Sequence, residues 1–143
     1  MTLLDSNTII HYLRGQESVV SRLQRTDNRL LGVPSVVLYE IEYGTLRTGS
    51  SRRRALLSDL LADMVHVPFD QEAALESARV RLELEALGIV IGPIDFLIAG
   101  TALSRGAVLA TNNTREFSRV KGLRLEDWTL PLHIHGLRGK PDD

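Results

Sequence analysis

Short, mostly apolar segments alternate with longer helical segments along this chain, and this alternation limits the fold more than any other feature. The apolar segments are expected to be strands, and they cover residues 2–4, 30–33, 65–67, 107–110 and 123–125. Because most of them are apolar throughout rather than at every second residue, both faces of the sheet should be covered. The sequence therefore predicts an α/β fold, with a mainly parallel central sheet and helices on both faces.

Helices are expected in the segments between these strands. Their predicted ranges are 6–13, 19–25, 36–46, 51–64, 71–87 and 93–105. Ser35 is expected to cap the third helix, while Asp70 and Gly88 should begin and end the longest one. The helix that opens after Gly92 is almost entirely apolar, which predicts that it is buried.

Composition narrows the class of protein further. The chain has 143 residues, of which 43% are hydrophobic and 24% are charged, so it can build one core, and disordered or coiled-coil classes are excluded. No apolar run approaches the roughly 20 residues of a membrane-spanning helix, and the start does not resemble a signal peptide, so we expect a cytoplasmic protein. The sequence predicts one domain over residues 1–128 and an extended or loose tail over 129–143.

The overall charge does not by itself indicate a polyanionic partner. The formal net charge is -1, whereas nucleic-acid-binding domains are often strongly basic. Of the 17 Lys and Arg residues only Lys121 and Lys140 are lysine, and arginine is the better bidentate ligand of phosphate. A coding bias towards arginine would give the same composition, so a local basic surface stays an open possibility.

Four acidic positions are expected where loops meet at the carboxyl ends of the strands, the edge at which open parallel sheets bind ligands. Two of them follow strands, and two stand in helices that should begin at the same edge. They are Asp5, Glu116, Asp95 and either Glu40 or Glu42, and Thr111 and Asn113 lie near Glu116 in the sequence. Periodicity does not decide between Glu40 and Glu42, although Gly44, one turn beyond Glu40, slightly favours Glu40 as the inward residue.

Each acid also has a simpler structural explanation. Asp5 could cap a helix, Asp95 could interact with a helix dipole, and Glu116 could be solvated. Asp95, however, is the sole charge on an otherwise apolar helix, where burial of an isolated carboxylate would be costly. Several gathered carboxylates raise one another's pKa unless a cation compensates. Since the chain has no cysteine and the candidate ligands are oxygens, Mg²⁺ or Mn²⁺ is the predicted ion.

Four segments, read in order, resemble the PIN-domain ribonuclease toxins of the VapC type. They are LDSNTII at 4–10, EIEYG at 40–44, GPIDFLIA at 92–99 and TNNTREFSRV at 111–120. The ending GLRLEDW at 122–128 is similar to the subgroup that cuts initiator tRNA. The resemblance implies a PIN-like, Rossmann-like three-layer domain over residues 1–128. It also implies a Mg²⁺- or Mn²⁺-dependent endoribonuclease that acts as a toxin, is neutralised by a cognate VapB-like antitoxin and forms a homodimer.

The resemblance also assigns roles to individual residues. It implies that Asp5, Glu40, Asp95 and Glu116 form the catalytic and metal-binding site, and that Asn7, Thr111 and Asn113 support it. Asn113 stands where many PIN domains carry an aspartate, and it can offer a cation only a neutral oxygen. The number of bound ions, one or two, therefore stays open.

Several basic residues are candidates for contacts with RNA phosphates or with metal. Among the arginines, Arg14, Arg47 and Arg115 are the expected RNA contacts, and Arg52, Arg53 and Arg54 belong to the same unranked set. His133 and His135 make an incomplete zinc set in the tail, so we expect them to have a loose or surface role. For His11, beside Asp5 on the first helix, packing is the simpler expectation.

Two other functions compete with the nuclease. In a phosphohydrolase with Asp5 as nucleophile, the loop needs a second acid where Asn7 stands, and a catalytic lysine is hard to place. In a PIN-like module that binds RNA or protein without cutting, Asn113 would be the suggestive residue. Cleavage of RNA that depends on metal separates the nuclease from both.

Overall fold

Five parallel strands form the centre of the molecule. The structure, a computed structural model, describes residues 1–131, and the strands pair in the order β3–β2–β1–β4–β5. The strands are β1 (Thr2–Leu4), β2 (Leu31–Pro34), β3 (Val65–Val67), β4 (Val108–Ala110) and β5 (Arg124–Glu126). Every neighbouring pair is parallel, which confirms the predicted sheet.

Seven α-helices and one short 3₁₀ helix connect these strands within residues 1–131. The helices are α1 (Ser6–Leu13), α2 (Glu17–Arg25), η1 (Asn28–Leu30), α3 (Ser35–Thr48), α4 (Ser51–Leu61), α5 (Gln71–Ala86), α6 (Pro93–Ser104) and α7 (Thr114–Phe117). All six predicted helices are present. None of the described helices has both the length and the apolar character needed to cross a membrane.

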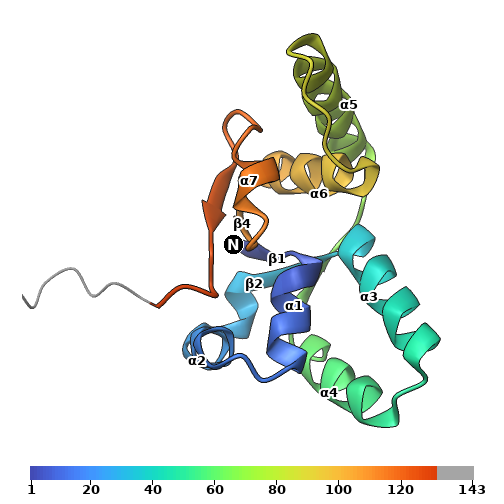
Figure 1. Cartoon of the computed structure of the whole chain (residues 1–143), viewed down its shortest axis with the longest axis vertical. Coiled ribbons are helices and arrows are strands. Elements are labelled where there is room, and N and C mark those ends of the chain that lie inside the picture. Colours follow the sequence, from blue (N-terminus) through green and yellow to red (C-terminus); the bar gives the residue numbers. More distant parts are fainter. Residues whose placement is uncertain (132–143) are drawn as a thin grey trace, which may run out of the picture.

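The order of the strands reverses at β1. The chain steps from β1 to β2 and β3, and then returns past β1 to β4 and β5. Because parallel crossovers are right-handed, helices before and after this reversal lie on opposite faces of the sheet. Figure 1 agrees, with α5 and α6 on one side of β1 and β2, and α1, α2 and α4 on the other. The prediction of helices on both faces is therefore confirmed.

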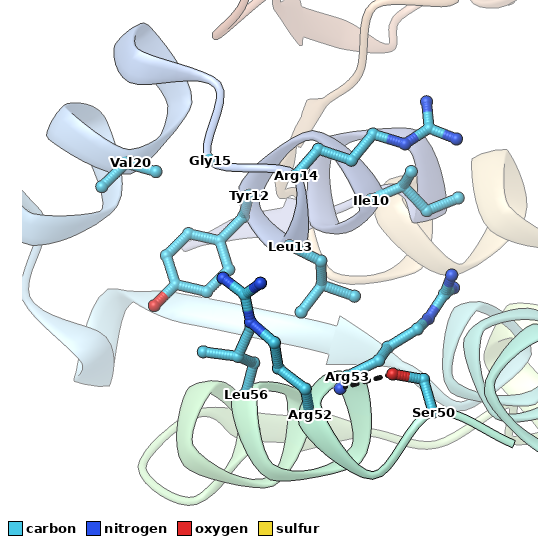
Figure 2. A pocket seen from close by; sticks show the side chains of 10 residues that line it. All are labelled: Ile10, Tyr12, Leu13, Arg14, Gly15, Val20, Ser50, Arg52, Arg53 and Leu56. Carbon is cyan, nitrogen blue, oxygen red and sulfur yellow. Dashed lines mark hydrogen bonds between the residues drawn. The ribbon is translucent and has the colours of Figure 1, made fainter.

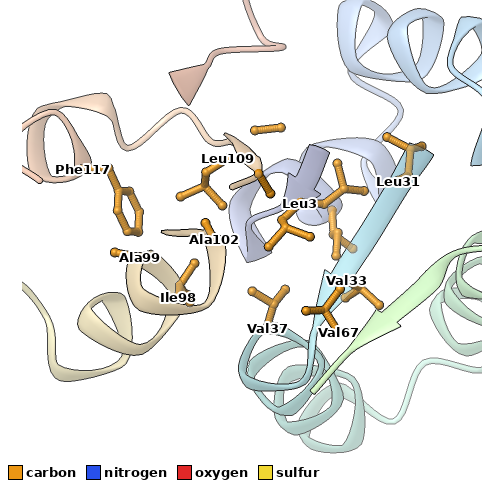
Figure 3. Close-up of a cluster of buried hydrophobic side chains, with 14 of the residues drawn as sticks. Leu3, Leu31, Val33, Val37, Val67, Ile98, Ala99, Ala102, Leu109 and Phe117 are labelled. Carbon is orange, nitrogen blue, oxygen red and sulfur yellow. The ribbon is translucent and has the colours of Figure 1, made fainter. Parts of the chain in front are cut away.

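Buried aliphatic side chains hold the layers together. Leu3 and Leu4 of β1 point to opposite faces of the sheet, yet both have no exposed surface. Val37 of α3 and Ile98 of α6 are equally buried, and the close-up of the core places them near the strands (Figure 3). Both faces of the central strand are thus covered, as the apolar pattern predicted.

Some predicted helix boundaries are wrong, and each has a local cause. Pro34, not Ser35, is the N-cap of α3, because the Ser35 hydroxyl donates instead to the carbonyl of Val67 at 3.3 Å. Helix α2 begins at Glu17 rather than at residue 19, since the side chain of Gln16 caps it through the amide of Val19.

The fourth helix and the loop after β4 also differ from the prediction. Helix α4 ends at Leu61 rather than near residue 64, and Met64 becomes a buried residue that leads into β3. The short helix α7 directly follows the polar cluster 111–113, where no helix was expected. Asn113 is its N-cap residue, so the helix begins where the predicted cluster ends.

The last described residues lie against α2. The indole of Trp128 is buried, its Nε1 donates to Glu126 at 2.8 Å, and the guanidinium of Arg22 lies over its ring at 5.3 Å. The hydroxyl of Ser18 donates to the carbonyl of Trp128 at 2.9 Å. His133 and His135 lie outside the described residues, so their predicted role is untested.

Helices α5 and α6 cross at a glycine. Gly100 of α6 lies against the backbone of Ser77 in α5, and a Cβ at Gly100 would stand 2.5 Å from the Ser77 nitrogen and 2.6 Å from its Cα. Real Cβ atoms do not approach backbone this closely, so only glycine permits this crossing. The contact fixes α6, the helix that carries Asp95.

Gly100→Ala should lower the free energy of unfolding by about 3 kcal/mol, the upper part of the range for overpacked cores. Urea unfolding followed by circular dichroism measures this change. Gly44→Ala is the matched control, because Gly44 also lies inside a helix but its Cβ would meet only the end of the Arg53 side chain, at 3.3 Å. That control should be neutral or stabilising by up to about 1 kcal/mol. Equal losses in both variants would contradict the crossing argument.

Candidate active site

The four predicted acids come from four elements that meet at the carboxyl ends of β1 and β4. Asp5 directly follows β1, Glu40 lies in α3, Asp95 lies in the first turn of α6, and Glu116 lies in α7 after β4. The charges of Asp5, Glu40 and Glu116 all raise the pKa of Asp95, so the four groups lie within electrostatic reach of one another. The reversal of strand order lies between β1 and β4, which is where open sheets bind ligands. We call the place where Asp5, Glu40, Asp95 and Glu116 meet the acidic crevice.

Asp5 is the most buried of the four acids, with 2% of its surface exposed. Its Oδ1 accepts from the Ser6 amide at 2.8 Å, so Asp5 is the N-cap of α1. This confirms the structural role that the sequence suggested for it. Its Oδ2 accepts from the Thr111 hydroxyl at 2.7 Å and from the Asn7 amide at 2.9 Å. Burial raises the pKa of Asp5, and these hydrogen bonds oppose the rise. The cap thus holds a carboxylate rigidly at the crevice.

Asp95 and Glu116 behave as a pair. Burial, then a hydrogen bond with Glu116 and the charges of the neighbouring acids, raise the pKa of Asp95 to about 8. The hydrogen bond with Asp95, together with one from Asn113, lowers the pKa of Glu116. A proton held on Asp95 and donated to the Glu116 carboxylate accounts for both the raised pKa of Asp95 and the lowered pKa of Glu116. A raised pKa for Asp95 and a lowered pKa for Glu116 are the directions expected of two carboxyls that share one proton.

The structure decides between Glu40 and Glu42. Burial, followed by the charge of Asp5, raises the pKa of Glu40, so this side chain lies beside the other acids. Glu42 instead accepts from Arg54 Nη1 at 2.6 Å, and this bond lowers its pKa. Within residues 1–131, Glu40 Oε1 is also buried without a hydrogen-bond partner. Glu40 is therefore the acid that lies with Asp5, Asp95 and Glu116, and within the described residues its Oε1 makes no hydrogen bond.

The predicted supporting residues form one hydrogen-bonded network around these acids. Asn7 Nδ2 donates to Asp5 Oδ2 and, at 3.2 Å, to the hydroxyl of the fully buried Thr111. That hydroxyl accepts from the backbone amide of Asn113 at 3.0 Å. The Asn113 side-chain amide then donates to Glu116 Oε2 at 2.9 Å. Asn113 thus orients an acid through its nitrogen.

Sequence reasoning missed the contributions of Ser6 and Asn112, and it expected packing rather than a polar contact for His11. The Ser6 side chain hydrogen bonds with Glu40 and lowers its pKa, opposing the effect of burial. The backbone amide of Asn112 donates to Asn7 Oδ1 at 3.1 Å, and its side-chain amide lies 3.0 Å from His11 Nε2. His11 therefore connects α1 to the loop after β4, although packing was the expectation for it. In the sequence, the only indication that Ser6 and Asn112 belong to the site is that they directly follow Asp5 and Thr111.

The side chains fit a divalent cation in their chemistry. All four acids supply oxygen, the ligand type that Mg²⁺ and Mn²⁺ prefer. Glu40 Oε1 has no hydrogen-bond partner in residues 1–131, and the raised pKa of Asp95 shows that positive charge is favoured there. In the part of the chain that the structure describes, no three acidic or histidine side chains are already arranged to hold one ion. The crevice therefore supplies the ligand atoms without a preformed coordination shell.

The three arginines expected to contact RNA lie in different places. Arg14 is the exposed C-cap of α1, and Arg115 is exposed on α7 beside Glu116. Arg47 is exposed near the end of α3, with its guanidinium 5.6 Å from the centre of the Tyr43 ring. Among residues 1–131 none of the three forms an ion pair with a site acid. They stay available, and their proposed role in binding RNA is a prediction.

The fold and sequence match known proteins over most of the chain. The chain is 35% identical over 128 residues to the tRNA(fMet)-specific endonuclease VapC of Salmonella typhimurium, covering 88% of this chain and 96% of that protein. It is 30% identical over 129 residues to ribonuclease VapC2 of Rickettsia felis, covering 88% of this chain and 96% of that protein.

Solved structures agree with the sequence matches. DNA-bound VapBC from Salmonella typhimurium superposes with a TM-score of 0.81 at 35% identity, covering 89% of this chain and 97% of that one. VapBC2 from Rickettsia felis, bound to a promoter DNA fragment, gives a TM-score of 0.80 at 30% identity, covering 89% and 98%. The PIN domain family model matches residues 2–123. This chain therefore belongs to the PIN domain family.

Proposed function

We propose that this protein is an endoribonuclease that hydrolyses RNA phosphodiester bonds with the help of a divalent cation, Mg²⁺ or Mn²⁺. The observation that carries the proposal is the gathering of acids from four distant segments, which raises the pKa of Asp95 to about 8. Such a site is electrostatically unfavourable unless positive charge enters it. PIN-domain nucleases are in general dependent on divalent metal ions, which supports this assignment.

We further propose that the protein is the toxin of a toxin–antitoxin pair and that tRNA is its substrate. The support is the name of one relative, a tRNA(fMet)-specific endonuclease, and the VapBC complexes among the similar structures. A nuclease acting on tRNA works in the cytoplasm, where tRNA is found. The partner would be a VapB-like protein, whose basic segment could occupy the acidic crevice in place of the cation. The homodimer implied by the family stays a prediction.

Each side chain of the acidic crevice has a distinct role in the proposed reaction. When bound, the cation would supply charge for the phosphoryl oxygens and a water molecule of lowered pKa. Asp5, fixed by Ser6, Thr111 and Asn7, would hold one side of the site. Glu40 would contribute its free oxygen, and Asp95 would release its stored proton. Asn113 would keep Glu116 turned towards Asp95.

A site built in this way suits hydrolysis more than covalent catalysis by Asp5. Both oxygens of Asp5 already accept hydrogen bonds, and the residue is almost fully buried, so it is poorly placed to attack a substrate. Lys121, the single lysine among the described residues, is exposed, and the site acids have no lysine partner there. These facts favour a water nucleophile over the Asp5 nucleophile of the phosphohydrolase alternative.

Asp95→Asn should lower the rate of tRNA cleavage by more than about a hundredfold, because loss of a ligand exceeds the 10- to 100-fold effects of outer-shell changes. A gel assay with purified protein in Mn²⁺ measures the rate, and circular dichroism confirms the fold. Glu72→Gln, an exposed acid of α5, is the control and should cut as wild type does. RNA binding without cleavage by the wild type would favour the non-cleaving module instead.

Expression in bacteria should arrest growth, and Asp95→Ala should abolish the arrest at an equal protein level, because the proposed toxicity requires the acid site. Growth curves with immunoblots measure both quantities. Glu72→Ala should arrest growth as the wild type does. Continued growth with abundant wild-type protein would contradict the toxin assignment.

The metal-free protein should lose stability as the pH rises from about 5 to 8. In this range a carboxyl with a raised folded pKa keeps a proton that the unfolded chain releases, so higher pH favours unfolding. Asp95→Asn should reduce this loss, whereas Asp59→Asn, on the exposed side of α4, should not. Melting temperatures measured in EDTA across this range test the expectation. Mn²⁺ should raise the melting temperature more at pH 8 than at pH 6, because it competes with the proton.

A further inference from the structure

A cleft with basic walls lies between α1 and α4, next to the acidic crevice but separate from it. Its volume is about 530 Å³, and none of the four site acids lines it. Three arginines line it above an apolar floor that includes Ile10 and Leu13, as Figure 2 shows. The arginines are Arg14 at the end of α1 and Arg52 and Arg53 at the start of α4.

The positive charge of this cleft is not neutralised within the described residues. Arg14, Arg52 and Arg53 form no ion pair there, whereas their neighbour Arg54 pairs with Glu42 at 2.6 Å. The guanidinium of Arg53 makes one hydrogen bond in that part of the chain, from Nε to the Thr45 hydroxyl at 3.2 Å. Its Nη groups therefore keep their donors, and two parallel N–H groups match the oxygens of a phosphate.

A glycine brings Arg53 close to the acids. Arg53 Nη2 lies 3.3 Å from where a Cβ of Gly44 would stand, so its guanidinium rests against α3 where that helix has no side chain. Gly44 follows Glu40 by one helical turn, a rise of about 6 Å. Gly44 thus lies on α3 between Arg53, which lines the basic cleft, and Glu40, which belongs to the acid cluster.

Helix α1 connects the same two places. Asp5 caps its first turn, and Arg14 caps its last, about 13 Å away along the helix axis at 1.5 Å per residue. In Figure 2 the Arg14 and Arg53 side chains extend to the same side, with Ile10 between them. A single chain of phosphates could therefore pass from one end of α1 to the other.

We propose that this cleft binds the phosphodiester backbone of the substrate RNA next to the bond that is cut. The inference rests on the proposed function and names the surface that holds the substrate. The acidic crevice repels a polyanion, and the net charge of -1 provides no general attraction. Local positive charge is therefore needed, and the cleft supplies it with arginines that have no ion-pair partner within residues 1–131. It also ranks the arginines: Arg14, Arg52 and Arg53 bind RNA, while Arg54 is held by Glu42.

The double variant Arg14→Gln/Arg53→Gln tests this proposal in two settings. In the inactive Asp95→Asn background, tRNA binding should weaken about tenfold or more per lost contact, the effect of a charge-assisted hydrogen bond. The slope of log affinity against log salt should also fall by about 0.7 per lost phosphate contact. Fluorescence anisotropy across salt concentrations measures both. In the otherwise wild-type chain, KM for tRNA should rise far more than kcat falls.

Three controls keep the result interpretable. Arg25→Gln removes one positive charge from the exposed side of α2 and should leave tRNA affinity unchanged. Arg53→Lys keeps the positive charge but loses the two parallel N–H donors of the guanidinium. Its affinity for tRNA should therefore lie between those of wild type and Arg53→Gln. Mn²⁺ binding by the double variant, measured by calorimetry, should equal that of wild type, which shows that the acidic crevice is intact.

The outcomes separate this proposal from the proposed function. Wild-type cleavage of tRNA with unchanged binding in the double variant overturns the cleft and leaves the nuclease standing. Binding that depends on Arg14 and Arg53, without any cleavage by wild type, supports the cleft and overturns the nuclease. A third outcome is that the double variant binds tRNA as wild type does but is no longer inhibited by a co-expressed antitoxin. This result would overturn the RNA assignment and show that the cleft binds a protein partner.

Discussion

The mutual repulsion of buried carboxylates is the constraint on which the site depends. Asp5 is almost fully buried, and its charge raises the pKa of both Glu40 and Asp95. The protein tolerates this arrangement through donors from Ser6, Thr111 and Asn7 and through the proton shared by Asp95 and Glu116. These hydrogen bonds and this proton offset only part of the repulsion, which a divalent cation would offset more strongly. The gathered acids thus lower the stability of the metal-free protein, and the proposed cation would relieve their repulsion.

The parallel sheet makes that arrangement possible. Reversal of strand order beside β1 opens a crevice between the loops after β1 and β4. The hydroxyl of Thr8 donates to the carbonyl of Ala110 at 2.8 Å, and the Asp5 amide donates to the same carbonyl at 3.0 Å, so these two loops are joined directly. On the other side, the tight contact of Gly100 with Ser77 fixes the helix that carries Asp95. Rigid elements therefore hold each acid.

Periodicity and apolar runs were sufficient to predict the strands, six helices and the acids at the sheet edge. They could not choose Glu40 over Glu42, because both helix faces are half apolar, and the choice depends on Arg54 twelve residues away. The start of α2 depends on a local cap by Gln16, and glutamine is not among the preferred N-cap residues. The start of α3 depends on a tertiary contact that no local pattern contains, the hydrogen bond from Ser35 to the carbonyl of Val67. The same holds for the basic cleft, because Arg14 and Arg53 are far apart in the sequence and meet only through packing of α1 and α4.

The position of β1 has a consequence for how the protein is made. The central strand β1 is synthesised before the other four strands of the sheet, and it pairs with β2 early but with β4 only after residue 108 has been synthesised. Glu116 is made later still, so the four acids cannot meet on a nascent chain that ends before residue 116. At roughly 5–20 residues per second, synthesis of the segment from β2 to α7 takes several seconds. Translation products that end before residue 116 therefore lack one of the four acids, and only a polypeptide synthesised past that residue can bring all four together.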